Sequence, residues 1–190
     1  MNLTLRSQRL VLTPLSLEDL DLTIEMFTNP EVVKHAGGVI SATEITQKMS
    51  TWSKRGGNGC IGIWTISDID TDEKYGSVAL LPIPIEEDDT NYSLVIPGEM
   101  PEGDIEIGYY LKQSAWGNGY ATEASRRILQ FAFQESPLQE VVATFDKENL
   151  KSRNVLEKSG FSDCGTMRCY GEEGLNFRIT RDQWLEKQPV

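Results

Sequence analysis

A glycine-containing turn, with one acidic residue shortly before it, has residue types and spacing that suggest chemistry. The turn runs from Gln113 to Ala121 and joins a strand-like segment, Ile105 to Leu111, to a helical pattern that begins near Tyr120. Glycines let the backbone approach a ligand closely, and a helix start offers unpaired N–H groups and the positive end of a dipole. The arrangement predicts a site for a phosphorylated ligand, although glycine pairs also form ordinary tight turns.

Two common nucleotide-binding signatures do not describe this turn. Thr122 stands where the third glycine of Gly-x-Gly-x-x-Gly would be, and the Gly-Lys-Ser/Thr sequence of phosphate-binding loops is absent. The turn therefore has to be interpreted together with the rest of the chain.

A second helical segment downstream supplies that context. Asn149 to Phe161 follows another apolar strand pattern. The segments Ile107–Leu111, Trp116–Ala124 and Val155–Phe161 resemble the GNAT superfamily of N-acetyltransferases, and within it the ribosomal-protein N-terminal acetyltransferase branch. Arg9–Leu15 is similar to the opening strand of that branch. The resemblance covers nearly the whole chain and is specific for the superfamily, much less so for the acceptor.

The order of elements favours an α/β or α+β protein, and the resemblance implies a GNAT fold with a mixed, mainly antiparallel sheet and a splayed cofactor-binding strand pair. The length of 190 residues suits one N-acetyltransferase domain over 1–190. Periodicity predicts five strands before a final hairpin: Arg9–Leu12, Cys60–Ser67, Lys74–Leu81, Ile105–Leu111 and Val141–Phe145. The final hairpin is predicted to pair Thr166–Tyr170 with Leu175–Ile179. Helices are predicted after Ser16, after Ser41, over Tyr120–Gln134 and over Lys151–Ser159.

The resemblance implies acetyl-CoA as co-substrate, with its pyrophosphate on the turn and its pantetheine arm beside the splayed strand. The family pattern has Gln or Arg three residues before its first glycine, where this chain has Ser114. Backbone amides supply most of the cradle, so the expected site survives this departure. The predicted cofactor-binding residues are Leu111, Trp116, Gly117, Asn118, Gly119, Tyr120, Ala121, Asn149 and Asn154, and Asn149 could equally cap the following helix.

Transfer of an acetyl group to an amine needs a base for the amine proton and a proton donor for the leaving thiolate. Glu106 lies where the family branch commonly carries Glu and is the predicted base, the alternative being a structural ion pair. Many family members place a tyrosine acid where this chain has Leu156. Ser152, one helical turn earlier, is the predicted replacement, unless it is a capping serine. Tyr170, Cys164 and His35 form no recognisable catalytic arrangement.

Composition excludes several other classes. A formal charge of −11 argues against nucleic acid and favours a cationic amine acceptor, either a protein N-terminus or a small amine. The acidic run Glu86–Asp89 is interpreted as a solvated loop, or alternatively as a gate that attracts the amine. No apolar stretch is long enough to span a membrane, and three cysteines with one histidine form no metal set, so we expect a cytoplasmic, metal-free protein, monomer or homodimer. The alternative function is a noncatalytic acyl-CoA-binding or sensing module.

Overall fold

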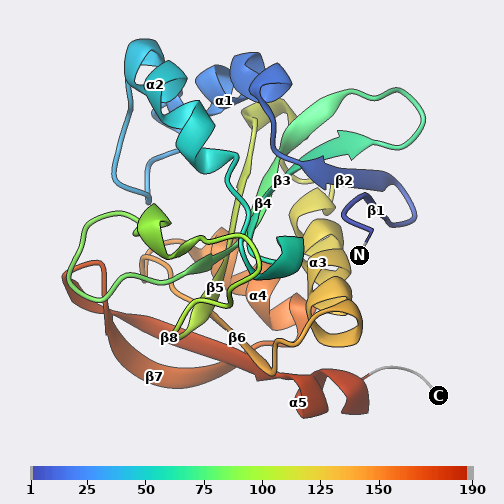
Figure 1. Cartoon of the computed structure of the whole chain (residues 1–190), viewed down its shortest axis with the longest axis vertical. Helices are drawn as coiled ribbons and strands as arrows, with labels where there is room; N and C mark the ends of the chain where they lie inside the picture. The colour runs from blue at the N-terminus through green and yellow to red at the C-terminus, as the bar shows by residue number, and fades with distance from the viewer. Residues whose placement is uncertain (1, 188–190) are drawn as a thin grey trace.

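An eight-stranded sheet forms the centre of the protein in a computed structural model that describes residues 2–187 (Figure 1). The strands lie in the order β1-β2-β3-β4-β5-β6-β8-β7, and all neighbouring pairs among the described residues are antiparallel except β5 with β6. This architecture confirms the expected mixed α/β fold. The strands are β1 (Leu5–Arg6), β2 (Leu10–Pro14), β3 (Gly62–Asp68), β4 (Lys74–Pro82), β5 (Ile105–Leu111), β6 (Glu140–Ala143), β7 (Ser162–Cys169) and β8 (Glu172–Thr180).

Helices cover both faces of the sheet. Because successive side chains of a strand point to opposite faces, Ile63 of β3 packs with the α1–α2 cluster, while Trp64 meets Phe131 of α3 with ring centroids 5.6 Å apart. The α1 and α2 helices lie together, α3 contacts α4, and α5 follows β8 at the far end of the molecule (Figure 1). The helices are α1 (Leu20–Phe27), α2 (Ala42–Trp52), α3 (Tyr120–Glu135), α4 (Leu150–Ser159) and α5 (Arg181–Glu186).

Helical segments begin after Ser16 and after Ser41, as predicted. Ser16 and Asp19 make a full capping box, but it opens a short 3-10 turn, Leu17–Asp19, before α1, and Leu17 is 66% exposed and does not join the apolar face. Ser41 caps α2 by accepting from the Glu44 amide, whereas the Glu44 carboxylate pairs with Lys48 at 3.3 Å. Ile45, Met49 and Trp52 form the buried face of α2.

The sequence patterns did not predict β1, α5 or the start of β7. The β1 strand has two residues, too few for an alternation to be visible. The β7 strand begins at Ser162 rather than Thr166, because its exposed polar start pairs with β8 across a register shift. The β6 strand ends at Ala143, two residues earlier than expected. None of the described helices is long and apolar enough to cross a membrane.

The sheet is incomplete between β5 and β6. These parallel strands hold register at one pair, Glu106 with Val142. The rest of β5, as far as Leu111, therefore has no strand partner on that side, although it stays paired with β4 on the other. The result is the expected splayed strand pair, and it opens the sheet where the predicted site residues lie.

Candidate active site

A large cleft of about 2090 Å³ follows the splayed strands from α1 and α2 to the start of α4. The structure brings most of the predicted site residues to its wall. Both predicted catalytic residues line it, as do Leu111, Trp116, Gly117, Gly119, Tyr120, Ala121, Asn149 and Asn154. Asn118 does not line the cleft, because its side-chain amide turns back to the carbonyls of Ala115 and Trp116 at 3.3 and 3.2 Å.

The glycine turn presents the start of α3 to this cleft. Gly117 and Gly119 have φ of +78° and +80°, a region that other residues enter only with strain. Gly119 is the N-cap of α3, and no side chain caps its first amides. The helix therefore begins with N–H groups available to an anion, and no atom outside the neighbouring residues lies within 4 Å of the position a Gly117 Cβ would take.

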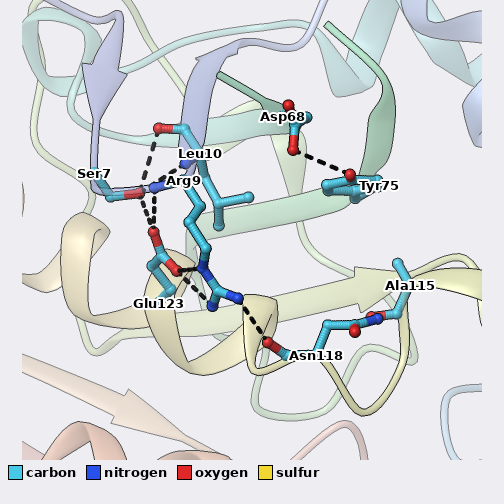
Figure 2. Close-up of polar contacts among 8 residues, drawn as sticks. All are labelled: Ser7, Arg9, Leu10, Asp68, Tyr75, Ala115, Asn118 and Glu123. Atoms are coloured by element: carbon cyan, nitrogen blue, oxygen red, sulfur yellow. Dashed lines mark hydrogen bonds and ion pairs between the residues drawn. The ribbon is translucent and has the colours of Figure 1, made fainter. Parts of the chain in front are cut away.

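An ion pair between Arg9, in the turn just before β2, and Glu123 of α3 holds the glycine turn in place. Figure 2 shows Ser7 and Arg9 converging on Glu123 of α3, while the Arg9 guanidinium extends to the turn. Arg9 Nε donates to Glu123 Oε2 at 2.7 Å, and its Nη1 donates to the Asn118 carbonyl at 3.1 Å. Burial opposes the ionisation of Glu123, but hydrogen bonds from Arg9 and Ser7 outweigh it and hold the Glu123 pKa below its ordinary value. Arg9 thus ties the charged first turn of α3 to the glycine turn.

Tyr120, the first residue of α3, is fixed from two sides. The Arg9 guanidinium lies over its ring, 4.8 Å from the centroid, and the Tyr75 ring stacks on it at 4.5 Å with an interplanar angle of 8°. Tyr75 in turn donates to Asp68 at 3.1 Å, a contact visible in Figure 2. Asp68 of β3 and Tyr75 of β4 therefore support the same helix start that Arg9 contacts from the β1–β2 turn.

The start of α4 faces the turn across the cleft. The Asn149 side-chain oxygen accepts from the Ser152 amide at 3.1 Å, so Asn149 is the N-cap and Ser152 is not. The Ser152 hydroxyl lies 2.8 Å from the Tyr109 hydroxyl of β5. Burial raises the pKa of Tyr109 to about 12, despite this hydrogen bond, so the phenol stays protonated. Sequence patterns do not single out Tyr109. It reaches Ser152 only because β5 lies beside the start of α4 in the fold.

Glu106 is half-buried in β5, where the strands part. Tyr170 donates to its Oε1, and the Thr144 hydroxyl lies 3.5 Å from its Oε2. Burial raises the pKa of Glu106 to about 7, and the two hydroxyl donors act in the opposite direction. The carboxyl can therefore exchange a proton near neutral pH.

Tyr170 is the second residue that sequence reasoning missed. Its position in the sequence shows no spacing that links it to a catalytic group. The turn between β7 and β8 reaches Glu106 of β5 although β6 lies between β5 and β8 in the sheet, and no local pattern in the sequence indicates this long-range contact. Burial, followed by the charge of Glu106, raises the pKa of Tyr170, so it remains a hydrogen-bond donor.

The remaining candidates fall into simpler roles. His35 Nδ1 lies 2.9 Å from Asp146 at the cleft wall. Cys60 and Cys169 are buried with pKa values raised by burial, as expected of inert thiols, whereas Cys164 is exposed. Among the described residues no group of His, Cys, Asp and Glu could hold a metal ion.

The cleft has an acidic, aromatic region and, beside α4, a region that carries three lysines together with Asp146 and Glu148. Asp88 and Asp89 line it near Phe27, Trp52 and the two tyrosines Tyr92 and Tyr110. Burial, and then the charges of Glu106 and Asp89, raise the pKa of Tyr110 to about 12. On the α4 side the lining cations are Lys147, Lys151 and Lys158, and the Lys151 ammonium lies 4.5 Å from the centroid of the Trp116 ring.

Comparisons with known proteins agree with this geometry. A family model described as "Acetyltransferase (GNAT) domain" matches residues 9–162. FsC-acetyl coenzyme A-N(2)-transacetylase of Aspergillus fumigatus is 30% identical over 195 residues, covering 97% of this chain and 79% of the relative. A GNAT acetyltransferase from Bacillus anthracis superposes with a TM-score of 0.73 at 19% identity, over 94% of this chain and 99% of that one.

A third comparison concerns the ligand. Aminoglycoside acetyltransferase AAC(6')-Ib, solved in complex with coenzyme A, has a TM-score of 0.73 at 16% identity, covering 95% of this chain and 99% of that one. The chain belongs to the GNAT family of acetyltransferases and is an N-acetyltransferase that acts with acetyl-CoA. The ribosomal-protein branch stays a prediction, since the match is to the family as a whole.

Proposed function

We propose that this protein transfers the acetyl group of acetyl-CoA directly to the primary amine of a small cationic molecule. Glu106 carries the proposal, because a carboxyl with a pKa of about 7 lies in the cleft beside the splayed strand. A protein N-terminus is the other acceptor class, implied by the resemblance to the ribosomal-protein branch.

We also infer one domain over 1–190, supported by a single sheet whose strands run from Leu5 to Thr180.

The glycine turn suits the phosphates of acetyl-CoA, which supplies the activated acetyl thioester. The uncapped start of α3 offers amides for a pyrophosphate, and the ammonium of Lys151 lies close by on α4. Leu111 and the unpaired side of β5 are the proposed wall for the pantetheine arm, and Asn118 supports the turn from behind. Further proposed contacts come from Trp116, Gly117, Gly119, Tyr120, Ala121, Asn149 and Asn154.

Glu106 is the proposed base. An aliphatic amine with a pKa near ~10 is mostly protonated at neutral pH and must lose a proton before its nitrogen can attack. Since burial raises the pKa of Glu106 to about 7, the carboxylate form that accepts this proton grows as pH rises through 7. Below that pH the carboxyl is protonated and cannot act, so the rate should fall on the acid side.

Ser152 is the proposed proton donor to the leaving thiolate. As the nitrogen–carbon bond forms and the carbon–sulfur bond breaks, its hydroxyl can donate to sulfur. The Tyr109 hydroxyl, 2.8 Å from Ser152 Oγ, can hold that hydroxyl in orientation and pass a proton to it, and the phenol then regains a proton from solvent. Leu156, where the family resemblance implies a tyrosine, is buried and offers no donor.

The lining of the cleft favours a small cationic acceptor. Asp88 and Asp89 attract a positive charge, and the nearby rings of Phe27, Trp52 and Tyr110 can pack on an ammonium or on apolar carbon. The name of the Aspergillus relative specifies transfer to an N(2) position, and the name of the fold neighbour specifies aminoglycosides. Both names fit amine acceptors, and neither acceptor is assigned to this protein.

The test combines an acceptor panel with one substitution. Release of free CoA and the mass of the product would be measured with small diamines, amino sugars and N-terminal peptides. Glu106→Gln keeps the shape of the side chain and removes the base, so the rate should fall by roughly 10² to 10⁴ and lose its acid limb near pH 7. Parental turnover across the pH range would refute the base. Acetyl-CoA binding without transfer to any amine would favour the noncatalytic module.

A further inference from the structure

A short stretch of the loop between β4 and β5 is fastened to the turn between β7 and β8. We call residues Pro84, Ile85 and Glu86 the strap. The amides of Tyr170 and Gly171 donate to the carbonyls of Pro84 and Ile85 at 3.1 and 2.9 Å. Two consecutive backbone hydrogen bonds therefore join segments that lie more than 80 residues apart in the chain.

A bidentate ion pair extends this connection. Arg168 donates through Nε and Nη2 to the two carboxylate oxygens of Glu86, at 2.9 and 2.6 Å. The hydrogen bonds from Arg168 hold the pKa of Glu86 below its ordinary value. Gly171 packs so closely that an added Cβ would lie 3.3 Å from the Glu86 carbonyl oxygen. The strap thus contacts the turn on both sides of Tyr170, at Arg168 and at Gly171.

The strap is hydrogen-bonded to Tyr170, whose backbone is strained. Tyr170 has φ of +51°, in the left-handed region that a non-glycine residue enters only with backbone strain. Such a conformation persists only when its surroundings fix it. Here the strap binds the amides of Tyr170 and Gly171, and the resulting direction of the side chain takes the phenol to Glu106.

We propose that Tyr170 is a positioning residue for Glu106, and that the strap keeps the Tyr170 phenol directed at the Glu106 carboxyl. The inference rests on the proposed function for its catalytic meaning, but not for its geometry. The strap belongs to the same loop as Asp88 and Asp89, which line the acceptor region of the cleft. A change in the position of that loop can therefore reach Glu106 through the hydrogen bond from Tyr170.

Several groups around Glu106 determine whether its pKa should rise or fall when the Tyr170 hydroxyl is removed. Thr144 also donates to the carboxyl, while Tyr92, Tyr110, Cys169 and Tyr170 all feel its charge. A phenol that donates to the carboxylate stabilises the charged form and lowers the pKa of Glu106, whereas burial raises it. Removal of the phenol leaves burial less opposed, so the pKa of Glu106 should rise above about 7.

The experiment titrates Glu106 itself, in the ligand-free protein. Glutamate carboxyls labelled with carbon-13 would be followed by NMR across pH, with the Glu106 signal assigned by its loss in Glu106→Gln. Tyr170→Phe should raise the Glu106 pKa by about 1 unit, the equivalent of one hydrogen bond. Glu86→Gln should raise it in the same direction by less, since the backbone bonds of the strap remain.

Glu87→Gln is the matched control, because it removes the same charge one residue away, at a position outside both the strap and the cleft lining. Its Glu106 pKa should equal that of the parent. An unchanged pKa in a folded Tyr170→Phe protein, or equal shifts in Glu86→Gln and Glu87→Gln, would overturn the inference. Failure of the proposed function is recognised separately, by parental activity in Glu106→Gln.

Discussion

At the scale of single residues, the site depends on polar groups held out of water. Glu106 is surrounded by phenols whose pKa values are all raised by burial, so each remains a neutral donor while the carboxyl titrates near 7. Ser152 has a comparable companion in Tyr109, which burial also keeps protonated. Each proposed proton-transfer group is thus hydrogen-bonded to one tyrosine hydroxyl. Glu106 contacts Tyr170 of the β7–β8 turn, and Ser152 contacts Tyr109 of β5.

Ser152→Ala should slow transfer from acetyl-CoA by roughly 10-fold, because about 1.4 kcal/mol of hydrogen bonding to the departing sulfur is lost. The loss should shrink with a thioester whose leaving thiol is more acidic, since that thiolate needs little protonation. Steady-state rates with both thioesters check this. Tyr109→Phe should show the same dependence more weakly.

Ser159→Ala is the control for this series. Ser159 lies on the same helix, but its hydroxyl donates to the Val155 carbonyl at 2.8 Å and does not line the cleft. It should behave as the parent with both thioesters. A Ser152→Ala defect of the same size for acidic and ordinary leaving thiols would contradict the assignment of Ser152.

At the scale of elements, the connection between the β1–β2 turn and α3 decides whether the glycine turn can receive an anion. Glu123 brings a negative charge to the first turn of α3, where the phosphates are expected. Arg9 neutralises that charge and also binds the Asn118 carbonyl of the turn. A helix start that carries an acid can bind an anionic ligand because Arg9 of the β1–β2 turn supplies the counterion of that acid.

Arg9→Met should weaken acetyl-CoA binding by roughly 10-fold, since it leaves Glu123 unpaired and frees the turn. Glu123→Gln in the same protein should restore part of the affinity by removing the repelling charge. Isothermal titration calorimetry on the parent, both single variants and the double variant measures the coupling. If the double variant binds no better than Arg9→Met, Arg9 acts by some route other than neutralising Glu123.

The elements also show what the sequence could predict. Long periodic segments such as α3, and starts such as Ser41, were found with nearly correct bounds, because their signals are local. The turn at Gly117 and Gly119 and the cap at Asn149 were visible for the same reason. Tyr170, Tyr109 and Arg9 were not assigned a role, since each acts on a group at least 43 residues away, across pairings that no local pattern encodes.

At the scale of the whole molecule, a net charge of −11 would repel acetyl-CoA unless local charge compensates. Lys147, Lys151 and Lys158 supply cations on the α4 side of the cleft, while Asp88 and Asp89 leave another part of its wall acidic. Glu86 and Asp89 are partly neutralised by Arg168 and Lys48. Only part of the acidic run is therefore available to attract an amine.

Replacement of both Asp88 and Asp89 by Asn should reduce kcat/KM for a cationic amine at low ionic strength and leave acetyl-CoA affinity unchanged. The difference from the parent should fade as salt approaches 0.5 M, since screening shortens the reach of charge. The paired control is Asp70→Asn with Asp72→Asn, an equal charge change in the exposed β3–β4 turn, away from the cleft. The same salt response in both double variants would make the acidic run a solvated loop.

The gap between β5 and β6 gives ligand binding a thermodynamic meaning for the fold. One registered pair joins these strands, so a ligand that fills the cleft adds contacts that the sheet itself lacks. A ligand bound only by the native state stabilises it by about 2.7 kcal/mol at one hundred times its Kd. The concentration of acetyl-CoA then sets not only how fast the protein works but also how much of it is folded.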